Sequence, residues 1–280
     1  MNKTLAIFEL MRLDKPIGIY LLLWPALLAL VISSNGNFEY VDLIIVIIGS
    51  ILVRSAGCVI NDIWDKDLDG GVERTKTRPI PSKKLSISES WVVFAVLGIL
   101  SLMLLSLTNA NTILISICFG LMIVVYPLTK RFFIGPQIFL GLTFNPTIIV
   151  YAMTNELNNP TMIFLYLAIA AKTIAFDSFY GLCDIEDDKK LGINSTPLWW
   201  GSKTLLIIAI LQFAVISFLL IVGLKAELSS AWYIGIILLS GFYFYQHRLA
   251  SQKNFLLAFK NNHWASLYLL TLSVFCFLII

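Results

Sequence analysis

A long apolar run passes directly into a group of acidic residues at positions 41–69, VDLIIVIIGSILVRSAGCVINDIWDKDLD. The run is long enough to cross a bilayer as a helix, which needs roughly 20 apolar residues. We call residues 61–69 the first acidic cluster. A later apolar run leads in the same way into residues 184–188, DIEDD, the second acidic cluster. Carboxylates beside the hydrocarbon core are costly unless they are paired, hydrated or metal-bound, so the two clusters predict one divalent-metal site built from two halves.

The composition is that of a multi-span membrane protein. Of the 280 residues, 58% are hydrophobic and 13% are charged, and the mean hydropathy is +0.85. Soluble domains of ordinary size are more polar. The length accommodates about nine spans in a single transmembrane domain over residues 1–280, with little left for a soluble domain. A net charge of +3, without a basic run that interleaves aromatic residues, gives no reason to expect nucleic-acid binding.

Nine apolar runs predict nine spanning helices. Their expected limits are 16–33, 41–61, 91–108, 111–128, 136–153, 160–183, 204–223, 229–246 and 264–280. Basic residues concentrate in the N-terminal segment and after the second, fourth, sixth and eighth spans, whereas the other loops hold only Lys225. The positive-inside rule then places the N-terminus and both acidic clusters in the cytoplasm and the C-terminus outside.

The acidic residues of the first cluster are spaced like one face of a helix. Asp62, Asp65 and Asp69 lie at i, i+3 and i+7, so a helix that continued from the preceding span would align them. Asn61 lies four residues before Asp65, on a neighbouring stripe, whereas Asp67 points away and is expected to be solvated. A solvated acidic surface would not require this spacing.

The second cluster shows the same kind of spacing. Asp177, Asp184 and Asp188 lie at i, i+7 and i+11, and Asp187 lies near the same face. Asp177 falls within an apolar span, where a solvated surface does not explain it. Mg²⁺ prefers hard oxygen ligands and is usually shared between carboxylates, water and substrate phosphate. Two facing carboxylate sets therefore predict magnesium ions with a diphosphate between them.

Basic residues that could contact a phosphate accompany the acids. Arg74 and Arg78 follow the first cluster, and Lys130 and Arg131 follow the fourth span. Positive-inside charge is the alternative explanation for these four residues. Arg54 differs because it lies within a span, on the side of the first cluster, and a buried guanidinium needs an anionic partner from the protein or a substrate.

These motifs resemble the UbiA family of membrane prenyltransferases. Residues 61–69 resemble its first signature, Asn-Asp-x-x-Asp-x-x-x-Asp, and Asp184-x-x-Asp187, with Asp177 upstream and residues 192–196 downstream, resembles the second. Further stretches resemble the branch that acts on 4-hydroxybenzoate; they are residues 12–25, 54–58, 74–81, 126–137 and 258–262. The resemblance covers nearly the whole chain. Lys172 departs from it, because an apolar or aromatic residue is expected at that position in the sixth span.

The resemblance implies an all-α polytopic membrane protein with about nine transmembrane helices around a central cavity. It implies an enzyme of the bacterial inner membrane that uses polyprenyl diphosphate and 4-hydroxybenzoate. The polyprenyl chain would move to the ring carbon ortho to the acceptor hydroxyl, an early step of ubiquinone biosynthesis.

The resemblance also implies roles for particular residues. The implied cofactor is Mg²⁺, held by Asp62, Asp65, Asp69, Asp177, Asp184 and Asp188, and all of these except Asp177 are the implied catalytic residues. The implied substrate-binding residues are Arg54, Asn61, Arg74, Arg78, Tyr126, Lys130, Arg131, Asp177 and Asp187.

Three alternatives remain at this point. Within the family, the acceptor could be haem, homogentisate, a naphthoate or a chlorophyllide. CDP-alcohol phosphotransferases are also membrane enzymes with an acidic metal motif, but their acids form one cluster with Gly and Arg between them. A secondary transporter would have acids near the middle of the membrane and discontinuous helices, whereas most acids here lie at one predicted edge.

Overall fold

The computed structural model describes residues 3–72 and 74–278, and within these ranges every regular element is a helix, as expected. The longer helices are α2 (Ile17–Ser33), α3 (Tyr40–Trp64), α4 (Ile87–Leu105), α5 (Ala110–Thr129), α8 (Thr161–Gly181), α11 (Thr204–Lys225), α12 (Ser230–Ser251) and α13 (Phe255–Leu278). The shorter ones are α1 (Lys3–Leu10), α6 (Pro136–Thr143), α7 (Thr147–Met153), α9 (Ile185–Leu191), α10 (Thr196–Trp200) and two 3₁₀ turns, η1 (Asp69–Gly71) and η2 (Gly201–Lys203).

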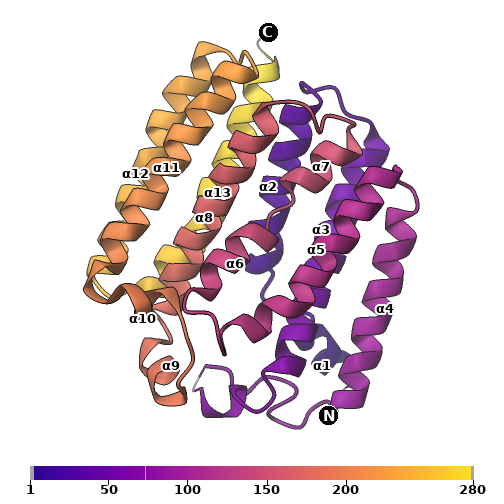
Figure 1. The fold of residues 1–280 in the computed structure, drawn as a ribbon, viewed down its shortest axis with the longest axis vertical. Helices are drawn as coiled ribbons and strands as arrows, with labels where there is room; N and C mark the ends of the chain where they lie inside the picture. Colours follow the sequence, from indigo (N-terminus) through magenta and orange to yellow (C-terminus); the bar gives the residue numbers. More distant parts are fainter. Residues whose placement is uncertain (1–2, 73, 279–280) are drawn as a thin grey trace.

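The long helices stand side by side in one bundle (Figure 1). Helix α8 packs against α11 and α13, α12 packs against α13, and α3 packs against α2 and α4. Helices α1, α9 and α10 lie at one end of the bundle, whereas α13 ends at the other (Figure 1). A chain that crosses the membrane an odd number of times, as the nine predicted spans would, has its first and last helices ending on opposite sides.

Five helical stretches of the described residues are long and apolar enough to cross a membrane. They are α3, α4, α5, α8 and Thr196–Lys225, while α2 is apolar but shorter. On α4, Val92, Val96, Ile99 and Met103 form one stripe and are each 50–63% exposed. Such a stripe on a soluble protein would be an aggregation liability, whereas on a membrane helix it faces lipid. The chain is therefore a membrane protein, and the count of nine spans stays a prediction.

The predicted fifth span is not a continuous helix, and its sequence explains why. Pro146 has no N–H to donate to the carbonyl of Leu142, and it also disfavours helical geometry at Asn145. Helix α8 provides the missing partner, since the Tyr166 hydroxyl donates to the Leu142 carbonyl at 2.8 Å. The side-chain amide of Asn145 donates in turn to the Tyr166 carbonyl at 2.9 Å. Irregular backbone at membrane depth is tolerated where protein covers it or where it lines a cavity.

The C-terminal helices pack tightly. Trp232 of α12 is fully buried and donates from Nε1 to the Leu219 carbonyl at 2.9 Å. A Cβ on Gly223 would lie 2.3 Å from the Trp232 ring, so glycine is required for this contact. In contrast, Gly98 on α4 and Gly120 on α5 have no neighbouring atom within 4 Å of a Cβ position. The open side of the bundle, between α2–α5 and α8, holds the site.

Candidate active site

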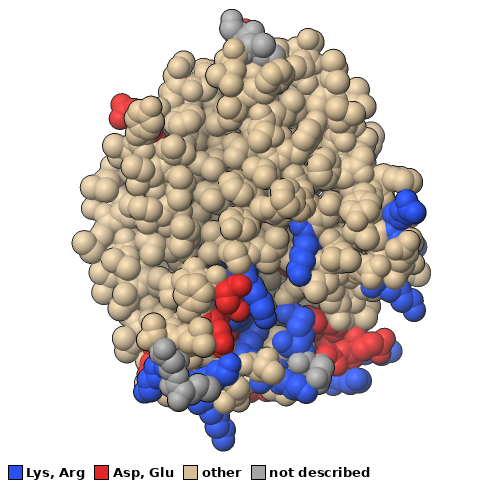
Figure 2. All heavy atoms as spheres, turned by 180° about the vertical axis from the view of Figure 1, so that it is seen from behind, with Lys and Arg blue, Asp and Glu red and all other residues tan. Residues whose placement is uncertain are grey.

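A cavity of about 1370 Å³ opens at the end of the bundle that carries α1 and α9. Charged side chains of both signs gather over this end and surround a hollow, while the rest of that face is almost uncharged (Figure 2). The mouth is lined by residues of both acidic clusters, and the depth is lined by apolar side chains such as Ile45, Leu104 and Ile149. The cavity exceeds the roughly 300–1,000 Å³ of most ligand sites, and it joins a polar mouth to an apolar interior.

Two arginines neutralise Asp62 in the last turn of α3. Arg12 donates from Nη2 to both carboxylate oxygens of Asp62 at 2.8 Å, and Arg78 donates from Nη1 to Oδ1 at 3.1 Å. The same Arg78 nitrogen donates to Asp69 at 2.8 Å. Asp62 is 1% exposed, so these ion pairs offset the cost of its burial. The sequence assigned no role to Arg12, because nothing in its spacing links the N-terminal segment to the first cluster.

The helix of the preceding span includes only residues 61–64 of the first cluster, so it does not continue far enough to align Asp62, Asp65 and Asp69 on one face. Helix α3 ends at Trp64, and Asp65 caps its C-terminus. A tight turn follows, in which the amides of Leu68 and Asp69 both donate to the Asp65 carbonyl at 2.8 Å. Asp62 and Asp69 are therefore brought together by this turn and by their shared arginine.

Asp65 points toward α5 and is paired there. Its Oδ2 accepts from Lys130 Nζ at 2.5 Å and from the Asn61 amide at 3.0 Å, whereas its buried Oδ1 has no hydrogen-bond partner among the described residues. Arg131, beside Lys130, donates to the Trp64 carbonyl at 2.5 Å. Lys130 and Arg131 thus fasten the end of α5 to the end of α3.

The second cluster begins a new helix. The expectation that Asp177 and Asp184 share one helix face is therefore wrong. Helix α8 ends at Gly181, and α9 begins at Ile185. The charges explain the break, because α9 carries acids in its first turn and lysines in its last turn, which suits the dipole of a separate helix. Asp187 is paired with Lys190 of the same helix at 3.6 Å and lies toward solvent.

One loop connects the two clusters. Arg74 donates from Nε to Asp184 at 3.0 Å, contacts the same carboxylate through Nη2, and lies 4.4 Å from the centre of the Tyr180 ring. Four residues on, Arg78 holds Asp62 and Asp69. These interactions raise the pKa of Arg78 and of Arg74 although burial alone would lower it. The loop therefore places two fully charged guanidinium groups at the mouth, one on each cluster.

The predicted site residues fall into two groups. The structure places the first group on the cavity wall: Arg54, Asn61, Asp62, Arg74, Arg78, Tyr126, Asp177, Asp184 and Asp188. The second group supports the wall or lies outside it: Asp65, Asp69, Lys130, Arg131 and Asp187. Arg12 and Tyr180 also line the cavity and had no predicted role.

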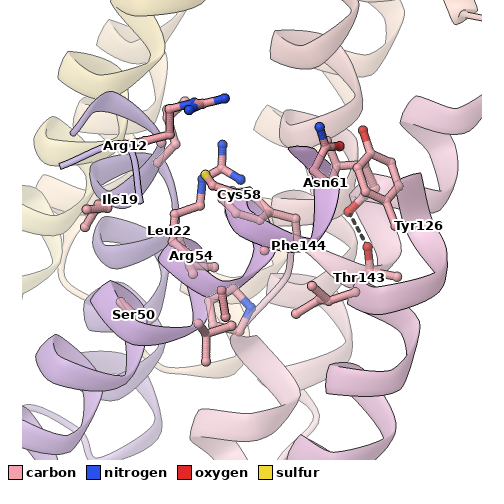
Figure 3. A pocket seen from close by; sticks show the side chains of 18 of the residues that line it. Arg12, Ile19, Leu22, Ser50, Arg54, Cys58, Asn61, Tyr126, Thr143 and Phe144 are labelled. Atoms are coloured by element: carbon pink, nitrogen blue, oxygen red, sulfur yellow. Dashed lines mark hydrogen bonds between the residues drawn. The ribbon is translucent and has the colours of Figure 1, made fainter. Parts of the chain in front are cut away.

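Arg54 lies on α3 seven residues before Asn61, about two helical turns away from the first cluster, and its side chain lies beside Phe144 (Figure 3). Its Cζ lies 5.3 Å from the centre of the Phe144 ring, and its buried Nε has no hydrogen-bond partner among the described residues. Asp177 and Tyr126 lie within electrostatic reach on the same wall. This region offers a planar cation, a carboxylate and a phenol to a bound molecule.

The carboxylates fit a divalent cation that is shared with a ligand. No three acidic, histidine or cysteine side chains in residues 3–72 and 74–278 lie close enough together to hold a metal by themselves. Mg²⁺, however, commonly takes one or two carboxylates and completes its shell with water and phosphate. Burial and the neighbouring Asp184 raise the pKa of Asp188 to about 6, and Asp65 Oδ1 is buried without a partner. A cation beside these oxygens would favour the ionised form of both carboxylates.

The structure explains how Lys172 is tolerated in α8. Its side chain is 2% exposed, donates to the Ser266 hydroxyl of α13, and lies 5.5 Å from the centre of the Phe176 ring. Phe176 lines the cavity, whereas Lys172 lies behind it. The departure from the family pattern therefore affects the contact between α8 and α13.

Sequence comparisons identify relatives over nearly the whole chain. The sequence model of the UbiA prenyltransferase family matches residues 22–278. A protein of Pseudomonas aeruginosa (strain LESB58) named 4-hydroxybenzoate octaprenyltransferase is 41% identical over 265 residues, which cover 92% of this chain and 89% of that protein. The protein of the same name from Vibrio campbellii (strain ATCC BAA-1116) is 39% identical over 272 residues, 95% of each chain.

Solved structures share the fold. A UbiA homologue from Aeropyrum pernix K1, without ligand, superimposes with a TM-score of 0.80 at 20% identity, covering 90% of this chain and 94% of that one. A UbiA homologue from Archaeoglobus fulgidus bound to GPP and Mg²⁺ superimposes with a TM-score of 0.75 at 18% identity, covering 98% and 100%. At these identities the likeness concerns the fold alone.

Proposed function

This chain belongs to the UbiA prenyltransferase family, and from that premise we propose that it transfers a polyprenyl chain from polyprenyl diphosphate to 4-hydroxybenzoate. The allylic C–O bond to the diphosphate breaks, a C–C bond forms to the ring carbon ortho to the hydroxyl, and that carbon then loses its proton, in an early step of ubiquinone biosynthesis. Relatives about 40% identical over most of the chain, named 4-hydroxybenzoate octaprenyltransferase, support this acceptor over the others of the family. The observation that carries the proposal is the loop whose Arg74 and Arg78 join both acidic clusters at the mouth of a deep apolar cavity.

The diphosphate binds at the charged mouth. Arg12, Arg74 and Arg78 line it, and the planar fork of a guanidinium suits phosphate oxygens. When the allylic C–O bond ionises, negative charge develops on the leaving diphosphate. Cations already fixed by ion pairs stabilise that charge without rearranging, which is the usual source of large electrostatic effects in catalysis.

The aspartates of the two clusters hold Mg²⁺ beside the diphosphate: Asp62, Asp65 and Asp69 from one side, and Asp177, Asp184 and Asp188 from the other. A bound Mg²⁺ would supply Lewis-acid stabilisation of the diphosphate charge. The ion pairs with Arg12, Arg78 and Lys130 offset the charge of the buried carboxylates, whose oxygens would be shared between these cations and the metal.

The prenyl tail lies in the apolar depth of the cavity. Each buried CH₂ contributes about 0.8 kcal/mol, so a long tail gains much of its binding energy there. The apolar walls also exclude water, which would otherwise capture the allylic carbocation before the acceptor ring attacks it. The need for an apolar, water-excluding cavity beside a charged mouth explains why the enzyme lies within the membrane.

The acceptor binds where Arg54 lies. The carboxylate of 4-hydroxybenzoate pairs with the guanidinium, whose Nε has no hydrogen-bond partner among the described residues. Tyr126 also lines the cavity and contacts the aromatic ring. With the acceptor held at this depth, its ring carbon faces the carbon of the prenyl diphosphate that ionises at the mouth.

The enzyme resides in the bacterial inner membrane with its charged mouth toward the cytoplasm. The positive-inside pattern and the gathering of charge at one end support this orientation (Figure 2). Family membership argues against the phosphotransferase and transporter hypotheses, although the break between α6 and α7 is a feature that a transporter would share.

A direct assay tests the proposal. Purified protein in detergent is incubated with radiolabelled polyprenyl diphosphate, 4-hydroxybenzoate and Mg²⁺, and homogentisate, a naphthoate or haem replaces the acceptor in parallel samples. We expect prenylated 4-hydroxybenzoate alone, and its loss in the Asp62→Ala and Asp184→Ala variants. Product from another acceptor, with none from 4-hydroxybenzoate, would move the enzyme to a different branch of the family.

A further inference from the structure

Arg54 lies close to a glycine and to an aromatic ring, and we call the space that these two residues leave for its guanidinium the slot. Gly18 lies in the first turn of α2, and a Cβ there would come within 2.5 Å of Arg54 Nε and 2.7 Å of Nη2. The Phe144 ring lies 5.3 Å from Arg54 Cζ, and Phe144 belongs to the unwound segment between α6 and α7 (Figure 3). Three elements far apart in the sequence thus meet at one guanidinium.

The backbone does not require glycine at position 18. Gly18 lies within a helix, and its φ is not among the positive values of the described glycines. Within a helix, glycine is about 1 kcal/mol less favourable than alanine. Because Gly18 lowers helix stability and its backbone does not require glycine, packing is the remaining reason for a glycine there. The three nearest atoms to a Cβ at this position are all from Arg54.

The slot determines which way the guanidinium faces. Arginine binds a carboxylate through a planar fork, so its use depends on the orientation of that plane. Arg54 as a whole is partly exposed and lines the cavity, whereas its Nε is buried beside Gly18 without a hydrogen-bond partner among the described residues. A ligand therefore reaches the guanidinium through its Nη groups, and Gly18 and Phe144 set the plane in which these groups lie.

We propose that Gly18 and Phe144 are positioning residues that orient Arg54 for the carboxylate of the aromatic acceptor, and thereby select acceptors that carry this carboxylate. The proposal rests on the proposed function, in which Arg54 binds that group. It assigns acceptor selectivity to the width of the slot, since a methyl group at position 18 would occupy the place of the guanidinium.

The first test is Gly18→Ala in purified enzyme. We expect the KM for 4-hydroxybenzoate to rise roughly tenfold or more, the usual effect of losing a hydrogen bond to a charged group, while the KM for polyprenyl diphosphate stays within about twofold. Because the clash involves the end of a flexible side chain, the melting temperature should not fall. Gly241→Ala is the matched control, because a Cβ at that position of α12 meets no atom within 4 Å.

The second test measures coupling to Arg54. In an Arg54→Lys background, which removes the planar fork, Gly18→Ala should change the acceptor KM by less than about twofold, since coupled residues are not additive. With 4-hydroxybenzamide, a neutral acceptor, Gly18→Ala should have no such effect on KM. Phe144→Leu should raise the KM for 4-hydroxybenzoate in the same direction as Gly18→Ala.

The outcomes separate this inference from the function on which it rests. An Arg54→Lys enzyme with an unchanged acceptor KM would remove Arg54 from the acceptor site and overturn that part of the proposed function. If Arg54→Lys raises the KM for the acceptor while Gly18→Ala or Phe144→Leu does not, the positioning role of Gly18 and Phe144 is wrong. The proposed role of Arg54 in binding the acceptor then remains. A Gly18→Ala enzyme that loses affinity for both substrates, or that melts earlier, would show a merely structural role and also overturn the slot.

Discussion

The two acidic clusters look alike in the sequence but differ in the folded protein. In the first cluster, Asp62, Asp65 and Asp69 are 1%, 2% and 5% exposed. They form ion pairs with three cations, Arg12, Arg78 and Lys130. The second cluster comprises Asp184 and the first turn of α9, which has no buried residue, and among the described residues Arg74 forms an ion pair with Asp184 across the mouth. The first cluster is therefore part of the folded framework, whereas the second remains free to respond to a ligand.

Metal removal affects both clusters at once, so it should have the largest effect. In excess EDTA the prenyl transfer should fall to background, because the carboxylates would have no divalent ion to share with the diphosphate. Activity should return on addition of Mg²⁺, as measured by product formation. Full activity in EDTA would refute a metal-dependent mechanism for both halves of the site.

Asp62→Asn tests the first cluster. We expect kcat to fall roughly 10²–10³-fold, as when a group that positions charge at the reacting bond is lost. The melting temperature should fall too, because Arg12 and Arg78 would lose their shared partner. Asp67→Asn, at an exposed position of the same cluster, is the matched control and should leave both quantities nearly unchanged.

Asp184→Asn tests the second cluster and sharpens the comparison. Activity should fall roughly 10- to 100-fold, since one charge-assisted contact at the mouth is weakened. Stability should change by less than about 0.5 kcal/mol, as is usual for partly exposed positions. A fall in melting temperature equal to that of Asp62→Asn would contradict the distinction between framework and responsive cluster.

Lys130→Met isolates the contribution of a cation to the first cluster. Asp65 would then be buried with only the Asn61 amide as partner, which should lower the free energy of unfolding by about 1–3 kcal/mol. Chemical denaturation in detergent would measure this change. The same substitution at Lys190, which pairs with Asp187 at the surface, should have no measurable effect on stability.

Asp187→Asn should have the smallest effect. Asp187 does not line the cavity and is paired with a lysine that is 73% exposed. We expect activity within about twofold of the unaltered enzyme, as for most surface substitutions. A larger loss in the prenyl-transfer assay would place Asp187 among the substrate-binding residues, as its position in the second signature suggested.

The sequence predicted the class of the fold, and nine of the predicted site residues line the cavity. Hydropathy predicted a membrane protein, since an apolar run of sufficient length has few other stable environments than a membrane. It also identified Arg54 and Asp177, because a charge within an apolar run needs a partner or a function. Neither inference depends on the neighbours of these residues in space.

Contacts between distant segments could not be predicted in this way. Arg12 pairs with a carboxylate 50 residues away, and Lys172 is satisfied by a hydroxyl 94 residues away. The endings of α3 and α8 also differ from the periodic pattern, because local turns and a new helix satisfied the backbone better than continued helices did. Helical spacing states which residues would share a face only while the helix continues.

The sequence by itself determined that this is a membrane protein with two acidic clusters at one edge, because hydropathy and the placement of charge are local properties of the chain. The tertiary structure decided which cations neutralise which acids, and why position 18 of α2 must leave room for Arg54. Those outcomes depend on helices packing side by side, where the cost of burying a charge is set by whichever side chain the fold places next to it.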